Sequence, residues 1–323
     1  MMNVGILGAG GIARKMAKTL NGMDQVKAYA IGSRSPEKAR SFAQEYGMVK
    51  AYGSYEELVD DPDIALIYVA SPHSHHAEHI RLALEHGKHV LCEKSFTVNE
   101  RQAKEVINLA KEKNLLLAEA IWTRYLPMRK MLTDTISSGV IGEVRSLTAN
   151  LGYVIDSVPR MREPRLAGGA LLDVGIYTIN FMLMVLGSDF TSFDTSVTFT
   201  ETGVDGQSVT VFTYPGNILA SLHSSQHVLT DRRGLIYGTR GYIEVMNINN
   251  PESIRVYDLD RNLVQELTQP KQITGFEYQV QACIESIVEG RIECPQMPHE
   301  EILTVMRTMD AIRAKWNFRY PME

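Results

Sequence analysis

The sequence predicts an α/β protein with two domains: a doubly wound parallel-sheet domain over residues 1–120 and an α+β domain over residues 121–323. Three observations predict this arrangement. The chain has 323 residues, whereas a single domain averages ~150. Short apolar runs alternate with amphipathic stretches up to about residue 120. Beyond that point, strand-like runs follow one another closely, with turn residues between them.

The first half reads as strands that alternate with helices. The apolar runs expected to form strands are Val4–Leu7, Val26–Ile31, Ile64–Ala70, His89–Leu91 and Leu115–Ala118. The stretches with helical spacing between them are Ile12–Leu20, Pro36–Tyr46, Tyr55–Asp60, Ser74–Glu85 and Asn99–Lys113. Ser35, Ser54 and Asn99 stand where helix N-caps are expected. This alternation predicts a parallel sheet with helices on both faces.

The second half changes pattern and predicts a largely antiparallel sheet. Helices are expected over Tyr125–Ser137, Leu171–Leu186, Gly275–Glu289 and His299–Trp316. Strands are expected over Val144–Leu151, Ser192–Thr200, Ser208–Tyr214, Leu219–His227, Leu235–Tyr237, Tyr242–Met246, Ile254–Asp258 and Leu263–Leu267. One face of this sheet is expected to lack helices. Val197, Phe199, Val209 and Val211 are expected to point outward there, and a two-fold homodimer through this face would cover them.

Composition excludes several classes of protein. The net charge is −5 with a pI near 6.0, which argues against a protein that binds nucleic acid by neutralising phosphates. Three cysteines are too few for a disulfide framework or a four-cysteine zinc site, and indicate a reduced, cytoplasmic setting. The longest uncharged apolar run, Val174–Ser188, is shorter than the ~20 residues of a membrane span. No carboxylate motif accompanies the histidines at positions 73–79, so no metal is expected.

The first strand leads into a glycine-rich turn typical of dinucleotide binding. Gly8, Gly10 and Ala13 match the pattern G-x-G-x-x-G/A. Gly8 makes the tight turn, Gly10 lets a pyrophosphate approach the backbone, and Ala13 lets the helix pack closely on the strand. Gly11 and Ile12 then open a helix whose free N–H groups attract phosphate. The pattern predicts a Rossmann domain; the alternative is a purely structural glycine turn.

The end of the second strand indicates which dinucleotide is bound. NAD-binding chains usually have an acidic residue there, which binds the ribose 2′-hydroxyl. This chain has Ser33-Arg34-Ser35 instead. The Arg34 guanidinium can bind a 2′-phosphate, with the Ser33 and Ser35 hydroxyls and Lys38 assisting. We therefore predict NADP(H), with NAD possible; the alternative is that Arg34 is a solvated loop charge.

Four further stretches carry a family resemblance. They are Ser71-Pro72-His73-Ser74-His75-His76, Cys92-Glu93-Lys94-Ser95, Glu119-Ala120-Ile121-Trp122-Thr123-Arg124, and the run from Gly168 to Tyr177. With the glycine turn, they make the chain resemble the glucose–fructose oxidoreductase/inositol dehydrogenase/rhizopine catabolism (Gfo/Idh/MocA) family. The similarity favours the branch that contains dimeric dihydrodiol dehydrogenase and NADP-dependent xylose dehydrogenases. It extends over nearly the whole chain in motif order and domain plan.

The resemblance implies which residues carry the chemistry. The family's Glu-Lys-Pro signature places a catalytic lysine at Lys94, beside Glu93, with Ser95 where the family usually has proline. Without the proline ring, the backbone dihedral after the lysine is no longer fixed. The family's Asp, followed four residues later by His, corresponds to Asp173 and Tyr177, and tyrosine at that place is typical of the dihydrodiol branch.

The reaction explains why these residue types are needed. Moving hydride to or from an alcohol carbon requires an acid or base within hydrogen-bond reach of the oxygen. Tyrosine ordinarily has a pKa near 10, and a neighbouring ammonium group lowers it. We assign Tyr177 as proton donor and acceptor, Lys94 as stabiliser of the alkoxide and cofactor contact, and Asp173 as orienter. Lys94 and Tyr177 could exchange the first two roles, and Tyr177 could also be a core residue of an apolar helix.

Further residues complete the predicted site. The family's Pro-x-x-x-His segment lines the cofactor, which implies that Ser71, Pro72, His73 and His76 do so here. Trp122 is a candidate wall for nicotinamide or substrate, and Tyr153 and Arg162 are candidates on the substrate side. The predicted function is an NAD(P)-dependent oxidoreductase that acts on a secondary alcohol or carbonyl of a sugar, polyol or cyclic diol. The alternatives are a non-catalytic dinucleotide-binding sensor and a family member that cycles its cofactor without releasing it.

Overall fold

The computed structural model describes residues 1–323, which form two compact units. Unit 1 comprises Met1–Tyr125 and Gln272–Met306, and unit 2 comprises Leu126–Lys271 and Arg307–Glu323. The sequence suggested one boundary near residue 120. The structure differs because Gln272–Met306 folds with unit 1, and the order of elements along the chain does not indicate such a return.

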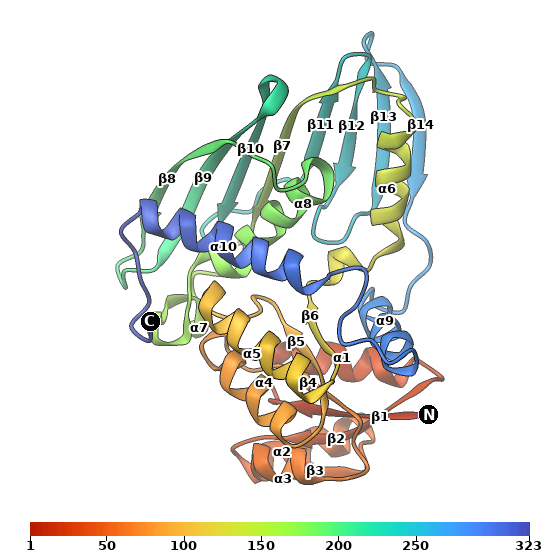
Figure 1. Cartoon of the computed structure of the whole chain (residues 1–323), viewed down its shortest axis with the longest axis vertical. Helices are drawn as coiled ribbons and strands as arrows, with labels where there is room; N and C mark the ends of the chain where they lie inside the picture. The colour runs from red at the N-terminus through yellow and green to blue at the C-terminus, as the bar shows by residue number, and fades with distance from the viewer. The chain divides into compact units, whose positions relative to one another are not determined.

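Unit 1 is built on a six-stranded parallel sheet in the order β3-β2-β1-β4-β5-β6 (Figure 1). Its strands are β1 (Met2–Leu7), β2 (Val26–Gly32), β3 (Lys50–Tyr52), β4 (Leu66–Val69), β5 (His89–Glu93) and β6 (Leu117–Ala120). Its helices are α1 (Gly11–Asn21), α2 (Pro36–Tyr46), α3 (Tyr55–Asp60), α4 (His76–Glu85), α5 (Glu100–Lys113) and α9 (Glu277–Val288). From β1, the next strands are added on one side as far as β3 and then on the other side from β4 to β6. Sheets of this kind bind ligands at this switch between β1 and β4, at the carboxyl ends of the strands.

The predicted strands and helices of the first half are confirmed, with one addition. Ser35, Ser54 and Asn99 each accept a hydrogen bond from the backbone N–H three residues on, so all are N-caps as expected. The additional strand is β3, which has the sequence Lys-Ala-Tyr. Three residues with a single central apolar side chain carry too little pattern to be recognised as a strand.

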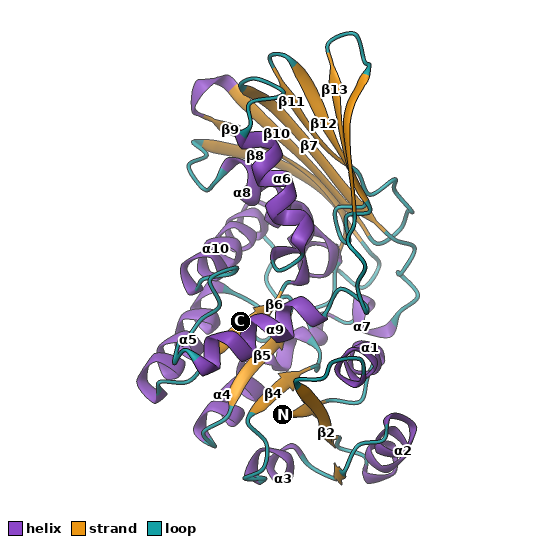
Figure 2. Ribbon diagram, turned by 90° about the vertical axis from the view of Figure 1, so that its right-hand side faces the viewer, coloured by secondary structure: helices purple, strands orange, loops and turns teal.

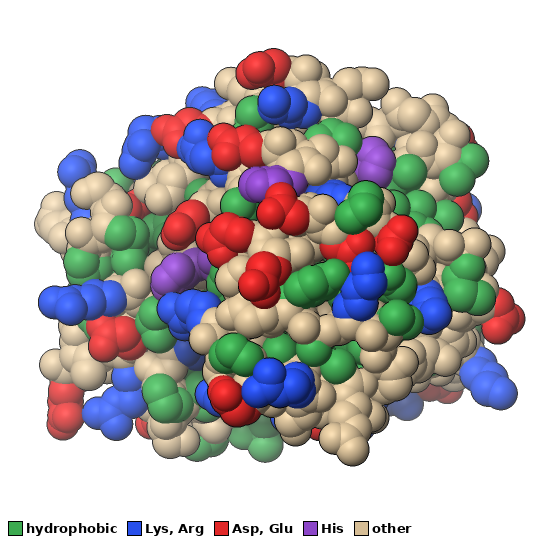
Figure 3. All heavy atoms as spheres, turned by 90° about the horizontal axis from the view of Figure 1, so that it is seen from below, with side chains coloured by type: hydrophobic (Ala, Val, Ile, Leu, Met, Phe, Trp, Pro, Cys, Tyr) green, Lys and Arg blue, Asp and Glu red, His purple; other side chains and the backbone are tan.

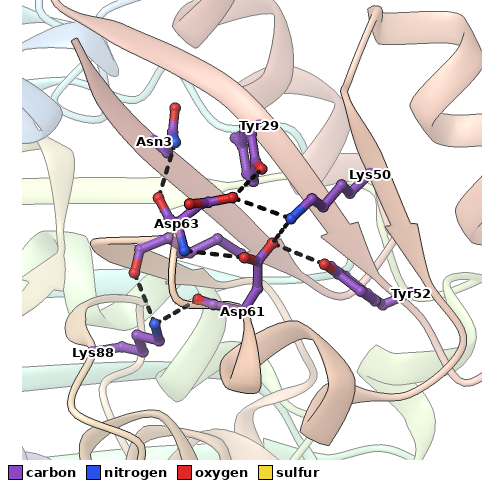
Figure 4. Close-up of polar contacts among 8 residues, drawn as sticks. Asn3, Tyr29, Lys50, Tyr52, Asp61, Asp63 and Lys88 are labelled. Atoms are coloured by element: carbon purple, nitrogen blue, oxygen red, sulfur yellow. Dashed lines mark hydrogen bonds and ion pairs between the residues drawn. The ribbon is translucent and has the colours of Figure 1, made fainter.

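The edge strand β3 is fastened to the sheet by a polar cluster, which we call the β3 network (Figure 4). The Lys50 ammonium donates to Asp61 (3.0 Å) and Asp63 (3.3 Å). The hydroxyls of Tyr52 and Tyr29 donate to Asp61 (2.8 Å) and Asp63 (2.9 Å), respectively. Asp61 is only 4% exposed. Seen from below, where α2, α3 and β3 lie in Figure 1, the surface carries acidic and basic side chains intermixed (Figure 3).

We expect Asp61→Asn to destabilise the protein by about 1–3 kcal/mol at pH 7, because it replaces a buried carboxylate that accepts several hydrogen bonds. Burial alone raises the pKa of Asp61, but the Asp63 N–H, Lys50 and Tyr52 together hold that pKa below its usual value. A lowered folded-state pKa adds stability above the unfolded value near pH 4, and this stability is lost as the pH falls through the folded value. Urea denaturation of parent and variant should therefore differ most at pH 7 and converge in acid.

The matched control for Asp61→Asn is Asp60→Asn. Asp60 is the neighbouring carboxylate, its side chain is 67% exposed, and it approaches only His86, at 3.3 Å. Exposed pairs of this kind contribute about 0–1 kcal/mol. Equal effects of the two variants, or a difference at pH 7 that persists in acid, would contradict the assigned role of the β3 network.

Unit 2 contains an eight-stranded sheet in the order β14-β13-β12-β11-β7-β10-β9-β8. Its strands are β7 (Val144–Gly152), β8 (Ser192–Phe199), β9 (Asp205–Tyr214), β10 (Ile218–Ser225), β11 (Gly234–Gly238), β12 (Gly241–Met246), β13 (Ser253–Asp258) and β14 (Leu263–Thr268). All neighbours are antiparallel except β7 and β10, which run parallel. The unit's helices are α6 (Pro127–Ser137), α7 (Pro159–Arg162) and α8 (Ile176–Leu186), and α10 (His299–Lys315) ends in it. The predicted fold class is confirmed.

One face of the unit 2 sheet packs on α8, which contacts β7 and β10, and the other face carries no helix (Figure 2). Apolar side chains lie on this open face: Val209, Val211, Leu219 and Tyr237 are 37–49% exposed. Strand register places Tyr237, Tyr242 and Tyr257 opposite one another on it, and the last two rings stack at 4.8 Å. The prediction for Val209 and Val211 is confirmed.

The prediction that Val197 and Phe199 share this open face is wrong. Val197 pairs with Ser208, which is buried on the opposite face from Val209. The Phe199 ring packs on Phe318 of the C-terminal segment, with centroids 5.7 Å apart. Alternating residues of a strand point to opposite faces, so the outward face of β8 depends on its register with β9, which the sequence of β8 alone does not reveal.

The segment of unit 2 from Pro164 to Leu186 has the length of a membrane span, and its most apolar 18-residue window has a mean hydropathy of 1.7. It is longer than the uncharged run at Val174–Ser188, because it also includes the π-helical turn at Leu171–Gly175 and, beyond a non-helical break at Ala167 and Gly169, the short helical turn at Pro164–Leu166. In the structure, 83% of its most apolar window is buried within the protein. A helix that is apolar all round and covered by other elements is typical of a protein core.

Candidate active site

The glycine turn between β1 and α1 has the geometry that a dinucleotide phosphate requires. Gly8 has φ +104°, and a Cβ there would lie 3.0 Å from the Ala70 carbonyl oxygen, so only glycine fits. Gly10 caps α1, and a Cβ on Gly10 or Gly11 would meet nothing within 4 Å. The first turn of α1 contains no acidic residue. The N-terminus of α1 therefore has the space and the free backbone N–H groups that a pyrophosphate needs.

Arg34 lies directly after β2 and is exposed at the surface. It is close enough to Tyr55 to lower that hydroxyl's pKa, although burial raises this pKa more strongly. The Tyr55 ring packs edge-on against His79 at 4.7 Å. Arg34 thus stands beside an aromatic pair that the sequence analysis did not single out, because α3 and α4 meet only in the fold.

The neighbouring serines have different surroundings. Ser33 is buried, and its hydroxyl accepts the Ser35 N–H at 3.3 Å. The Ser35 hydroxyl caps α2 by accepting the Lys38 N–H at 3.4 Å and donates to Glu37 at 3.1 Å. Ser35 is therefore engaged in the helix cap, while Lys38 is exposed. Arg34 is the cation best placed to receive an incoming anion.

The segment after β4 gathers four histidines at the carboxyl edge of the sheet. His79 bonds through Nδ1 to the Ser71 hydroxyl at 2.8 Å, and its ring stacks on His75 at 5.7 Å. His76 is fully buried, with both ring nitrogens against backbone carbonyls, and His73 is 7% exposed. No group of three or more His, Cys, Asp or Glu side chains in the chain is arranged to hold a metal ion.

Lys94 follows β5 at the same edge and is half-buried. Glu93, buried beside it, accepts hydrogen bonds from the Tyr68 hydroxyl and from the Lys94 N–H, the latter at 3.2 Å. The peptide bond between Lys94 and Ser95 is cis. The predicted catalytic lysine thus lies at the carboxyl end of a central parallel strand, where ligands bind in such sheets.

Trp122 lies in a cluster that the sequence analysis recognised only in part. Its ring meets Phe276 edge-on at 4.6 Å, and the Lys15 ammonium is 4.3 Å from the Trp122 centroid and 4.1 Å from the Phe276 centroid. Burial lowers the pKa of Lys15, while Glu93 and Glu277 act to raise it. Lys15 and Phe276 were missed because Phe276 comes from the returning segment Gln272–Met306, which no local pattern connects to α1.

In unit 2, Asp173 and Tyr177 lie at the start of the α8 helix. Asp173 belongs to a π-helical turn, Leu171–Gly175, and Tyr177 to the first turn of α8; both are buried. Arg160 of α7 donates to both Asp173 oxygens, at 2.9 and 3.4 Å. This two-point contact fixes the Asp173 carboxylate. Arg160 was missed because α7 has only four residues, too few to show a periodic pattern.

A buried carboxyl group anchors the same segment from another strand. Asp205 of β9 accepts the Leu171 N–H at 2.6 Å. Burial raises the pKa of Asp205 to about 7. A Cβ on Gly169 would lie 2.1 Å from the Asp205 carboxylate, so glycine is required at this approach. The glycines before Asp173 therefore serve close packing.

The remaining substrate-side candidates, Tyr153 and Arg162, lie elsewhere in the chain of unit 2. The Tyr153 hydroxyl accepts a hydrogen bond from the Asn249 side chain at 3.0 Å, and the Arg232 guanidinium lies 5.8 Å from the Tyr153 ring. Arg162 is exposed on α7.

A glycine turn at the topological switch of a parallel sheet, with Lys94 after the carboxyl end of a neighbouring strand, is the arrangement of a dinucleotide-binding protein. The comparisons agree. Residues 2–120 match the model of the "oxidoreductase family, NAD-binding Rossmann fold", and residues 130–244 match the GFO/IDH/MocA C-terminal domain. The chain belongs to the Gfo/Idh/MocA family, as the sequence predicted.

Relatives and solved structures match nearly the whole chain. Trans-1,2-dihydrobenzene-1,2-diol dehydrogenase of Xenopus tropicalis is 34% identical, over 98% of each chain. D-xylose 1-dehydrogenase (NADP(+)) of Hypocrea jecorina is 30% identical, over 98% of this chain and 92% of the relative. The structure of KijD10, a 3-ketoreductase from Actinomadura kijaniata in complex with NADP and TDP-benzene, has a TM-score of 0.88 at 26% identity, covering 97% of each chain.

Proposed function

We propose that this protein transfers hydride between NADP(H) and a secondary alcohol or carbonyl group of a sugar, polyol or cyclic diol. The observation that carries the proposal is Lys94 at the carboxyl end of β5, in a chain whose relatives are named as diol, sugar and keto-group oxidoreductases. When bound, the nicotinamide ring supplies or accepts the hydride. These relatives support an enzyme over the non-catalytic sensor.

The preference for NADP rests on Arg34. No acidic residue follows β2 to bind a ribose 2′-hydroxyl, and the exposed guanidinium stands where a 2′-phosphate would need a cation. Arg34 can bind such a phosphate through two N–H groups at once. The relatives named for NADP use are consistent with this assignment.

Two side chains are proposed to carry the chemistry, and two others to position them. Tyr177 gives or takes the proton of the substrate hydroxyl, and Lys94 stabilises the developing negative oxygen. Arg160 fixes the Asp173 carboxylate, which orients its neighbours on α8. Lys94 and Tyr177 belong to different units, so their assignment to one reaction rests on the family motifs.

The proposed function is tested by following NADPH absorbance with a panel of aldoses, ketones and cyclic diols in both reaction directions. Turnover with at least one member, and faster turnover with NADPH than with NADH at limiting cofactor, is the expected result. Tight NADPH binding with no turnover of any compound would favour the sensor. Cofactor that stays bound and is reduced and reoxidised in place would favour the cycling alternative.

We further propose that two copies associate through the open face of the unit 2 sheet, and that the protein is cytoplasmic. The support for association is the apolar and aromatic character of that face, which carries Val211, Leu219 and the three tyrosines of β11–β13. Contiguous exposed apolar surface is unfavourable in water and often marks an interface. The support for the location is the small number of cysteines.

Analytical ultracentrifugation should find the parent at twice the chain mass of 36.2 kDa. Val211→Glu with Leu219→Glu should shift it to the monomer, because two closely placed carboxylates on each copy would be buried against their symmetry mates. The control is Val288→Glu on α9, where a residue that is 79% exposed should tolerate charge without a change in mass. A monomeric parent would refute the proposed association.

A further inference from the structure

One peptide group near Lys94 is held on both of its sides by buried side chains. It joins Ser95 and Phe96, and so begins one residue after Lys94. Its carbonyl oxygen lies 2.7 Å from Nδ1 of His76. Its N–H donates to Oε1 of Glu119 at 3.1 Å. His76 and Glu119 are both 0% exposed.

His76 reaches this peptide from the first turn of α4. Its other ring nitrogen, Nε2, lies 2.8 Å from the Ser71 carbonyl oxygen, so the ring bridges the segments that follow β4 and β5. Burial lowers the pKa of His76 to about 4, and nearby Lys94 acts in the same direction. The neutral ring has a single N–H to donate. The Ser71 and Ser95 carbonyls act against burial and raise this pKa, because a protonated ring donates to both of them. The Ser95 contact is the shorter of the two, and we assign an N–H to Nδ1 in either protonation state.

Glu119 reaches the peptide from β6, where its residue pairs with Cys92 of β5. Its backbone carbonyl accepts the Tyr125 hydroxyl at 2.8 Å, which holds the strand end in place. Burial raises the pKa of Glu119 to about 8, and Glu93 adds to this, while the Phe96 N–H, Arg124 and Lys94 act against it. A carboxyl oxygen accepts the Phe96 N–H whether or not Glu119 is protonated, so this contact rests on the position of the side chain.

We propose that His76 and Glu119 form a peptide clamp on the Ser95–Phe96 group that positions Lys94 for the reaction. This inference rests on the proposed role of Lys94. A lysine side chain has four rotatable bonds, and only a fixed backbone gives its ammonium a defined range. A displacement of a reacting group by about 1 Å can lower the reaction rate about 10²-fold. His76 and Glu119 act through Lys94 and are positioning residues.

This role differs from the cofactor contact expected of His76. Both of its ring nitrogens already lie against backbone carbonyls, and its side chain has no exposed surface. A residue in that situation affects the cofactor through the loop that it holds. Glu119 stands in a motif that carries the family resemblance, but nothing in the sequence connects its side chain to the Phe96 N–H.

Two substitutions at Glu119 separate the clamp from general stability. Glu119→Gln keeps an oxygen that can accept the Phe96 N–H, whereas Glu119→Leu has a similar size and no acceptor. We expect Glu119→Leu to lower kcat about 10- to 100-fold, with the KM for substrate and the Kd for NADPH within about threefold of the parent. Glu119→Gln should retain kcat within about threefold, because the glutamine keeps the oxygen that accepts the Phe96 N–H.

Substitutions at His76 test the other side of the peptide. His76→Asn places an amide N–H near the position of Nδ1, while His76→Leu places none. The kcat of His76→Asn should exceed that of His76→Leu by about tenfold, because only the asparagine variant keeps the hydrogen bond to the Ser95 carbonyl. Asp61→Asn is the stability control, because it weakens the β3 network at the amino edge of the same sheet. It should lower the denaturation midpoint and leave kcat unchanged.

Hydrogen exchange at the Phe96 amide reports on the clamp without any turnover. Exchange should be at least tenfold faster in Glu119→Leu than in the parent and unchanged in Glu119→Gln. Unaltered kcat in Glu119→Leu, or an equal loss of kcat in Asp61→Asn, would overturn the positioning role. If the parent turns over no compound of the panel, the proposed function fails, and the exchange rates still decide whether the clamp exists.

Discussion

Replacing Lys94 with alanine is expected to lower kcat by about 10²- to 10⁴-fold, the range for losing a positioned acid, base or charge stabiliser. Lys94 is half-buried at the carboxyl end of β5, and its N–H is held by the buried Glu93 carboxylate. Affinity for NADPH, measured by fluorescence quenching, should fall by less than kcat, because the glycine turn and Arg34 would retain most of the binding contacts. Lys104→Ala is the control, since Lys104 pairs on an exposed helix face with Glu100 at 2.8 Å.

The partner change, Tyr177→Phe, should cause a loss of similar size, since it removes only the hydroxyl. The pH dependence of kcat then distinguishes the two groups. The residue whose loss abolishes one limb of the parent profile is the proton donor, and the other stabilises charge. If both variants keep most of the parent kcat, the assignment of Lys94 and Tyr177 is wrong, even if the protein proves to be an oxidoreductase.

Arg34→Ala is expected to raise the Kd for NADPH by about 10- to 100-fold, which corresponds to one lost charge-assisted contact. The Kd for NADH should change little, because NADH has no 2′-phosphate. Arg40→Ala, on the exposed face of α2 where Arg40 approaches Glu37 at 3.5 Å, is the matched control. An unchanged ratio of the two dissociation constants in Arg34→Ala would remove Arg34 from the cofactor site.

Much of the fold follows from short-range pattern. The buried strands β1, β2, β4, β5 and β6 read as apolar runs because a parallel sheet covered on both faces excludes water from every side chain. The helix starts at Ser35, Ser54 and Asn99 follow from side chains that satisfy the first N–H groups of a helix. The short strand β3 did not follow, because its stability comes from Lys50, Asp61 and Asp63, which meet only in the fold.

The candidate site divides along the same line. Gly8 and Gly10 were predictable because a tight turn and an uncovered helix start both require glycine within a few residues of one another in the sequence. Lys94 and Tyr177 were identified through the family resemblance. The Arg160 contact to Asp173 was not predictable, because its partners come from separate helical turns. Nor was the clamp of His76 and Glu119 on the peptide after Lys94, whose parts come from α4, β6 and the end of β5.

The sequence by itself therefore determined the two kinds of sheet, the glycine turn and the choice of cofactor-binding fold, since periodicity and turn chemistry act over a few residues. Only the tertiary structure decided the return of Gln272–Met306 to unit 1, the outward face of β8 and the surroundings of Lys94. Those features depend on which strands pair and in which register. That choice is made by the packing of the whole unit, because a pairing is stable only when every strand of the sheet buries its apolar face at once.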